Sequence, residues 1–147
     1  MKKIIFVDFD DTICLHNVHI DIDDRMFLNS NEASEKFYSK SELNQPLYKY
    51  LVNENNNGAK IILLTSACSK MLDVKKYWLK TNCPLIEFDD YISASIDINK
   101  TQIMLSYAKH NKIDVSNIIL IDDSCTERRT AEEGGIFTYN PQLIMNK

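Results

Sequence analysis

Aspartates are concentrated directly after two apolar segments of this sequence. They are Asp8, Asp10, Asp11, Asp122 and Asp123. A third apolar segment is followed by the hydroxyl residues Thr65 and Ser66. Carboxylates that lie this close together cannot all stay ionised unless a positive charge compensates them. Because their oxygens are the ligands that Mg²⁺ prefers, the pattern predicts a magnesium site if the segments meet in space.

Three short runs of aliphatic and aromatic residues precede these polar positions: Ile4–Val7, Ile61–Leu64 and Ile118–Ile121. Continuous apolar runs of this length are typical of parallel strands that are buried on both faces. In an open α/β sheet, ligands bind beyond the carboxyl ends of such strands. The polar residues after the runs should therefore meet at one edge of the sheet.

Segments with helical periodicity alternate with the predicted strands: Pro46–Asn55, Ser69–Lys80 and Thr101–His110. Pro46 suits a first turn, Ser69 suits an N-cap, and Gly58 and Gly134 suit positions just after a last turn. Further strands are predicted at Tyr91–Ser95 and Ile136–Tyr139. The alternation predicts an α/β fold in which residues 1–147 form a single domain, a doubly wound, Rossmann-like parallel sheet of about five strands.

Residues 13–43 interrupt this alternation and predict a small insertion over the site. Val18–Ile22 alternates like a short hairpin strand, and Glu32–Tyr38 has the pattern of a helix. Such an insertion is too small for an independent lid. We therefore expect an open cleft, with a large substrate or a second subunit of a homo-oligomer covering it.

Composition excludes several other classes of protein. The chain has 17 basic and 21 acidic residues and a net charge of −4, so it has no broad footprint for nucleic acid or an anionic membrane. Its first apolar run is too short for a signal peptide, and no segment has the length of a membrane span. The four cysteines lack CxxC spacing, which favours reduced thiols in a cytoplasmic protein.

The polar segments together resemble the haloacid dehalogenase superfamily. Asp8-Phe9-Asp10-Asp11-Thr12 resembles its first motif, D-x-D-x-T, and Leu64-Thr65-Ser66 resembles its second motif. Lys100 at a predicted helix start resembles the third motif, and Asp122-Asp123 resembles the acidic fourth motif. The four motifs occur in the family's order. The resemblance implies a phosphatase with a minimal cap, acting on a phosphorylated substrate of unknown class.

The resemblance also implies roles for the first two acids. Asp8 would be the nucleophile that forms an aspartyl-phosphate, which replaces one difficult displacement by two easier ones. Asp10 would be the general acid/base, first protonating the leaving oxygen and then activating water. Thr12 is interpreted as fixing the turn after the nucleophile, and Asp11 as structural.

The cofactor that the resemblance implies is Mg²⁺. Its ligands would be the carboxylates of Asp8 and Asp122 and the backbone carbonyl of Asp10, with Asp123 as an alternative or indirect ligand. Phosphoryl oxygens would be held by the Thr65 hydroxyl, by the Ser66 backbone N–H at a helix start and by the Lys100 ammonium.

Two alternatives compete with the phosphatase. A response-regulator receiver domain also clusters Asp, Thr and Lys around Mg²⁺, but its acidic pair comes first, whereas here Asp122-Asp123 follows Lys100. A catalytically silent or slow module that binds phospho-ligands in the same cleft remains open.

Other side chains are placed outside the site: the histidines His16 and His19, a predicted solvated lysine face, and the core residue Trp78. That face consists of Lys70, Lys75, Lys76 and Lys80.

Overall fold

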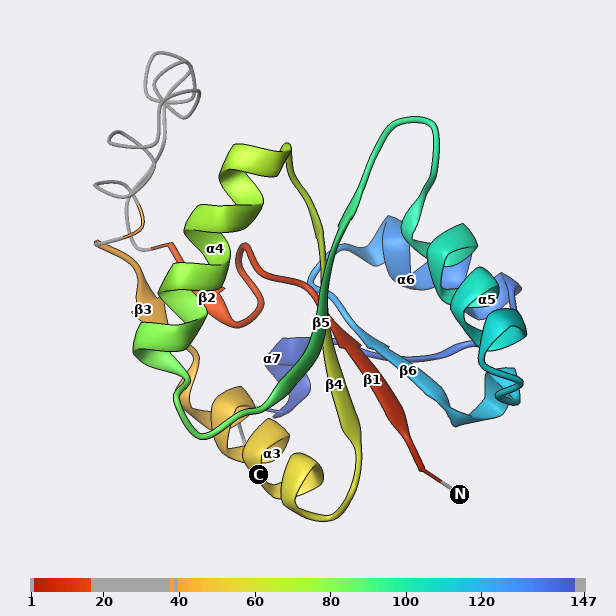
Figure 1. Ribbon diagram of the computed structural model, residues 1–147, viewed down its shortest axis with the longest axis horizontal. Coiled ribbons are helices and arrows are strands. Elements are labelled where there is room, and N and C mark those ends of the chain that lie inside the picture. Colours follow the sequence, from red (N-terminus) through yellow and green to blue (C-terminus); the bar gives the residue numbers. More distant parts are fainter. Residues whose placement is uncertain (1, 17–37, 39, 145–147) are drawn as a thin grey trace.

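A parallel five-stranded sheet forms the centre of the molecule. The computed structural model describes residues 2–16, 38 and 40–144 (Figure 1). The strands lie in the order β5-β4-β1-β6-β7. Their bounds are β1 Ile4–Val7, β4 Lys60–Ser66, β5 Phe88–Ala94, β6 Ile118–Ile121 and β7 Phe137–Tyr139. The predicted α/β doubly wound sheet is thus confirmed.

Strand β1 occupies the middle of the sheet, between β4 and β6. Ile4 is in register with Lys60 on one side and with Ile118 on the other. All four residues of β1 are buried because alternate side chains enter different cores, Ile5 and Val7 on one face and Ile4 and Phe6 on the other. A strand covered on both faces needs an unbroken apolar run, which is the pattern in the sequence.

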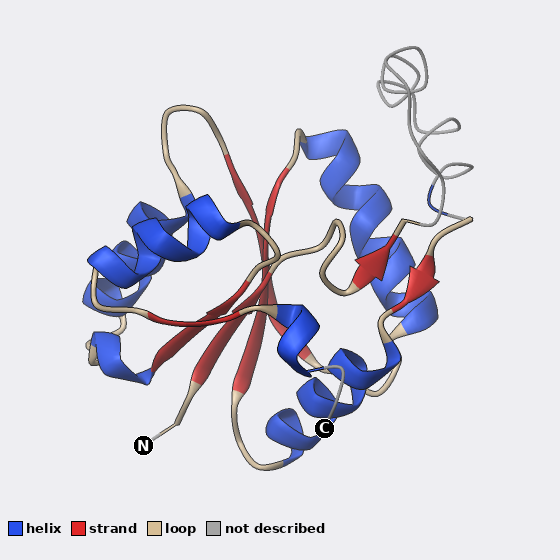
Figure 2. Ribbon diagram, turned by 180° about the vertical axis from the view of Figure 1, so that it is seen from behind, coloured by secondary structure: helices blue, strands red, loops and turns tan. Residues whose placement is uncertain are grey.

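Helices cover both faces of the sheet (Figures 1 and 2). On one face lie α3 Gln45–Asn56, α4 Ser69–Asn82 and the short α7 Pro141–Ile144, which contribute to the same apolar cluster. The other face is covered by α5 Lys100–His110 and α6 Cys125–Glu133. Because neighbouring strands of this sheet are all parallel, their carboxyl ends lie at a common edge between the two helical layers.

The helix ends differ in detail from the sequence prediction. Asn44 caps α3 by accepting a hydrogen bond from the Leu47 N–H, and Gly134 follows the last turn of α6. The N-cap of α4 is Cys68, so the prediction of Ser69 as that cap was wrong. Ser69 is already the first helical residue, and Cys68 carries the extended backbone conformation of a cap without a side-chain hydrogen bond.

The predicted insertion begins and ends in two short strands. β2 Cys14–Leu15 pairs antiparallel with β3 Glu42–Leu43, which brings the two ends of the insertion together. The predicted strand 18–22 and nearly all of the predicted helix 32–38 lie outside the described residues. Within the described part of the chain, no helix combines the length and the apolar character needed to cross a membrane.

Candidate active site

A tight turn after β1 places two aspartates at the carboxyl edge of the sheet. The Asp8 N–H donates to the Ile121 carbonyl, 2.9 Å away, which extends the pairing of β1 with β6 by one residue. The chain then reverses, and the Cys14 N–H donates to the Phe9 carbonyl across the turn. Asp11 is exposed at its tip with a φ of 56°, a left-handed conformation that Asp tolerates better than most residues. This geometry fits the interpretation of Asp11 as a structural residue.

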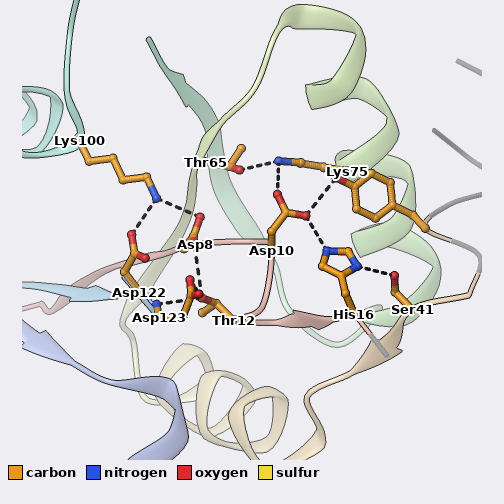
Figure 3. A network of polar contacts seen from close by, with 11 residues as sticks. Asp8, Asp10, Thr12, His16, Ser41, Thr65, Lys75, Lys100, Asp122 and Asp123 are labelled. Atoms are coloured by element: carbon orange, nitrogen blue, oxygen red, sulfur yellow. Dashed lines mark hydrogen bonds and ion pairs between the residues drawn. The ribbon is translucent and has the colours of Figure 1, made fainter. Parts of the chain in front are cut away.

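Three carboxylates meet beside this turn. Asp8, Asp122 and Asp123 each offer an oxygen, and these oxygens lie within 4.8 Å of one another. The Lys100 ammonium donates to Asp8 Oδ1 at 3.0 Å and to Asp122 Oδ2 at 2.7 Å (Figure 3). The Thr12 hydroxyl lies 3.3 Å from Asp8 Oδ2 and 3.2 Å from Asp123 Oδ1. Thr12 therefore links the turn to the acidic pair after β6.

The start of α6 holds Asp122 in place. The Ser124 N–H donates to Asp122 Oδ1 at 2.9 Å, and the Arg128 guanidinium donates to the Asp122 carbonyl at 2.8 Å. Asp122 is only 1% exposed, whereas Asp123 is exposed. The buried carboxylate is thus held by Ser124 and Lys100, while Arg128 holds the backbone carbonyl of the same residue.

The electrostatics of this cluster suit a divalent cation. Burial raises the pKa of the Asp8 carboxyl, the neighbouring Asp122 raises it further, and Lys100 opposes both effects. When the three carboxylates are ionised, the ammonium balances only one of their charges. A set of oxygen donors with a residual charge of −2 fits Mg²⁺. Binding of this ion would favour the ionised form of Asp8.

Lys100 reaches the cluster because α5 begins at that residue. Asn99 caps the helix, and its side chain accepts a hydrogen bond from the Gln102 N–H while the Gln102 side chain accepts one from the Asn99 N–H. This capping box fixes the first turn of the helix and therefore the root of the lysine side chain. The Lys100 residue is 4% exposed, and burial lowers its pKa less than Asp8 and Asp122 raise it.

Asp10 stands apart from the carboxylate cluster and is held by three donors. His16 Nε2 lies 2.8 Å and the Tyr38 hydroxyl 3.0 Å from its Oδ1, and Lys75 donates to its Oδ2 at 2.9 Å. Burial would raise the pKa of Asp10, but the hydrogen bonds from His16 and Lys75 and the charge of Lys75 lower it to about 2. His16 in turn contacts the Ser41 hydroxyl at 3.0 Å.

Two of these partners correct the sequence interpretation. Lys75 is not part of a solvated lysine face, because the residue is 1% exposed and also donates to the Thr65 hydroxyl at 2.8 Å. His16 is not outside the site, because its ring contacts Asp10. His19 lies outside the described residues. The prediction of Trp78 as a core residue is confirmed by its exposure of 6%.

Ser66 occupies a different position from the one predicted. It is the exposed last residue of β4, and α4 begins at Ser69, so its N–H is not at a helix start. The strand ends later than expected, since Ser66 is still in register with Ala94 of β5. Thr65 is 1% exposed and lies next to Lys75 and Asp10 (Figure 3).

The arrangement can be compared with known proteins. No family model and no curated protein sequence matches the chain. Among solved structures, a HAD-family enzyme of Bacteroides thetaiotaomicron in complex with magnesium and inorganic phosphate superimposes with a TM-score of 0.64 at 13% identity, covering 95% of this chain and 94% of that one. A HAD-superfamily hydrolase of Ehrlichia chaffeensis gives 0.62 at 17% identity, covering 99% and 96%. The chain has the haloacid dehalogenase fold.

A larger protein contains the same fold as one part. A chain of the Pnkp1/Rnl/Hen1 RNA repair complex superimposes with a TM-score of 0.63 at 19% identity, over 95% of this chain and 42% of that one. The haloacid dehalogenase resemblance of the motifs is thus confirmed at the level of the fold. The motif residues of this HAD-fold chain lie where strands β1, β4 and β6 end and where α5 begins (Figure 3).

Proposed function

We propose that the protein is a Mg²⁺-dependent phosphatase that hydrolyses a phosphomonoester through an aspartyl-phosphate on Asp8. The observation that carries the proposal is the Lys100 ammonium, which bridges the buried carboxylates of Asp8 and Asp122 beside Asp123. A cation and a carboxylate cluster at one sheet edge can neutralise a phosphate dianion while an anionic nucleophile approaches it.

In the first step, a carboxylate oxygen of Asp8 attacks phosphorus. The new bond joins that oxygen to phosphorus, and the bond between phosphorus and the leaving oxygen breaks as Asp10 gives the leaving oxygen a proton. Asp10 is ionised at neutral pH in the substrate-free site, since its pKa is about 2. A phosphoryl dianion next to it raises this pKa, because a like charge disfavours the ionised form.

In the second step, water attacks the aspartyl-phosphate. Asp10, now a carboxylate, takes a proton from the water, and the bond between Asp8 and phosphorus breaks to release inorganic phosphate. Thr65, Ser66 and Lys100 are the proposed donors to the phosphoryl oxygens. The residues proposed to hold Mg²⁺ are Asp8, Asp122, the carbonyl of Asp10 and, alternatively, Asp123. When bound, the ion supplies Lewis-acid neutralisation of the charge between nucleophile and phosphate.

A second candidate is a silent or slow module that binds a phospho-ligand in the same cleft. One observation favours it: three donors already surround the Asp10 carboxylate and hold it in the ionised form. Such a carboxylate is a poor proton donor until a substrate changes its surroundings. In this case phosphate would bind with Mg²⁺ but would not turn over.

Hydrolysis of an aryl phosphate tests the proposal, measured with Mg²⁺ and with excess EDTA. The phosphatase requires turnover that depends on Mg²⁺, and calorimetric binding of inorganic phosphate without turnover would instead favour the silent module. Equal rates in EDTA would contradict the metal dependence. A panel of phosphorylated metabolites, nucleotides, phosphopeptides and end-phosphorylated oligonucleotides then tests the substrate class. We also propose that the cleft is open, so that either a large substrate or a second subunit covers it.

A further inference from the structure

Lys75 is a buried cation that the proposed mechanism does not use. It lies on α4, one residue after Val74 and three before Trp78, and is 1% exposed. Burying an ammonium is unfavourable unless oxygen partners replace the water that it loses. Lys75 has two such partners, Asp10 Oδ2 at 2.9 Å and Thr65 Oγ1 at 2.8 Å.

These two partners belong to different parts of the proposed reaction. Asp10 is the proposed acid/base, and Thr65 is a proposed donor to the phosphate. One ammonium therefore joins the loop after β1 to the end of β4 through α4 (Figure 3). The carboxylate cluster is served by another lysine, Lys100, so the charge of Lys75 is not required there.

The chemistry of the ammonium group defines the direction of both hydrogen bonds. An ammonium only donates, so Thr65 Oγ1 must accept from Lys75, and the Thr65 hydroxyl hydrogen is not used in this contact. That hydrogen can then point toward a phosphoryl oxygen. In the same way, Asp10 Oδ2 accepts from Lys75. This contact restricts rotation of the Asp10 carboxylate and so fixes its orientation toward the leaving oxygen of the substrate.

The buried ring of Phe9 is a third contact of the Lys75 ammonium. Phe9 is the residue between Asp8 and Asp10 in the sequence. Its ring is fully buried and packs edge-on against Tyr38 and Trp78. The Lys75 ammonium lies over this ring, 5.3 Å from its centroid, a distance at which a cation is attracted to the ring face. The lysine is therefore fixed by packing as well as by its hydrogen bonds, as a positioning group requires.

We infer that Lys75 is a positioning residue, whose single ammonium group holds the Asp10 carboxylate and the Thr65 hydroxyl in the orientations that phosphoryl transfer needs. The inference rests on the proposed phosphatase function and extends it to a residue outside the four motifs. The hydrogen bonds of Lys75 go to Asp10 and Thr65 and not to the carboxylates of Asp8, Asp122 or Asp123, so it acts through its two partners.

The test compares Lys75→Met with the matched control Lys80→Met, an exposed lysine on the same helix. Kinetics are measured with a 4-nitrophenyl phosphate and with an alkyl phosphate, whose leaving oxygen needs more help from an acid. Lys75→Met should lower kcat by about 10–100-fold, since positioned acid/base catalysis is worth about that much or more. The loss should be larger for the alkyl ester, and inhibition by inorganic phosphate should weaken. Lys80→Met should behave as wild type.

A double-mutant cycle separates positioning from general damage to the fold. In an Asp10→Asn background, Lys75→Met should lower kcat for the alkyl ester by a smaller factor than in the wild type. The part of its effect that acts through Asp10 is already lost, and only the part that acts through Thr65 remains. A full second loss in that background would overturn the inference. If Lys75→Met does not fold by circular dichroism, Lys75→Gln, which keeps N–H donors without the charge, takes its place.

The outcomes distinguish this inference from the proposed function. If the wild-type protein hydrolyses aryl phosphate and Lys75→Met retains its kcat with both esters, the inference is overturned while the phosphatase stands. If the wild-type protein neither turns over aryl phosphate nor binds inorganic phosphate, the proposed function fails, and the inference that depends on it fails too.

Discussion

Two lysines divide the charge of the site between them. Lys100 pairs with Asp8 and Asp122, and Lys75 pairs with Asp10. Each ammonium is buried and each bridges two oxygen-bearing side chains. Each lysine lowers the pKa of its own aspartate. Burial nevertheless raises the pKa of Asp8, whereas the combined donors lower that of Asp10. Carboxylates with different environments are suited to different roles in one reaction.

This division predicts that Asp8→Asn and Asp10→Asn fail differently. Asp8→Asn removes the nucleophile, so turnover should fall by several orders of magnitude without any covalent intermediate. Asp10→Asn keeps the nucleophile but removes the base that activates water, so with a good aryl leaving group the aspartyl-phosphate should accumulate. Intact mass after acid quench should show a phosphorylated protein only for Asp10→Asn.

The wild-type protein quenched under the same conditions is the control for that experiment. Parent-like hydrolysis by both variants would contradict the assignment of a covalent phosphatase site. A phosphorylated Asp8→Asn protein would place the nucleophile elsewhere. Because the pKa of Asp8 is raised, the neutral amide resembles the protonated form of the carboxyl, and we expect Asp8→Asn to fold without metal.

The two lysines also differ in how well the sequence could predict them. Lys100 follows a recognisable cap and precedes an acidic strand end, so its place in the order of motifs indicates the site. Lys75 has no motif around it and shares its helix with exposed lysines. A signal was nonetheless present, because Met71, Val74, Lys75 and Trp78 have the i, i+3, i+4, i+7 spacing of one helix face. A lysine inside an apolar stripe indicates a buried charge.

At the scale of elements, the first turn of α5 places Lys100. Asn99→Ala removes a side chain that accepts from the Gln102 N–H, so we expect a loss of about 1 kcal/mol in the free energy of unfolding. Activity should fall as well, because a frayed first turn no longer fixes Lys100. Asn99→Ser keeps an N-cap acceptor and should retain most of both properties. Chemical denaturation and aryl phosphate turnover would measure the two effects, and an unchanged Asn99→Ala protein would contradict them.

The four cysteines differ in exposure, and their reactivity can therefore test the packing of the fold. Cys68 precedes α4 and Cys125 begins α6, and both are exposed, whereas Cys14 and Cys83 are buried. Burial raises the pKa of both buried thiols to about 12, so they stay protonated and unreactive up to well above neutral pH. A thiol reagent at pH 8 should label two of the four cysteines in native protein and all four in denaturant. Rapid labelling of Cys14 or Cys83 in native protein would contradict the packing.

Elements with an apolar pattern were predictable, and those without one were not. The predicted runs Ile4–Val7 and Ile118–Ile121 coincide with β1 and β6, since both strands are buried on both faces. Helix α6 buries only Ala131, so its sequence offers few apolar residues from which a helix facing the core could be predicted. The strands β2 and β3 have two residues each, too few for an alternating pattern. Their pairing depends on a contact between residues far apart in the sequence.

At the scale of the whole molecule, the carboxylate cluster links the loop after β1 to the loop after β6. These loops are distant in sequence and meet only when the sheet has formed. A cation that binds the cluster therefore binds the folded state and has no equivalent site in the unfolded chain. Metal binding should consequently appear as stability of the entire fold rather than as a local change.

Mg²⁺ is accordingly expected to raise the melting temperature. An ion present at 100 times its Kd stabilises the fold by about 2.7 kcal/mol, a rise in Tm of roughly 5–10 °C for a chain of this size. Asp122→Asn should remove most of this shift, whereas Asp73→Asn, the same change on the exposed side of α4, should retain it. Ca²⁺ should also raise Tm but support little turnover, because its looser coordination misplaces the nucleophile. Differential scanning calorimetry with each ion and with EDTA measures these shifts. A Tm that does not respond to Mg²⁺, or a full response in Asp122→Asn, would show that the ion does not bind at this cluster.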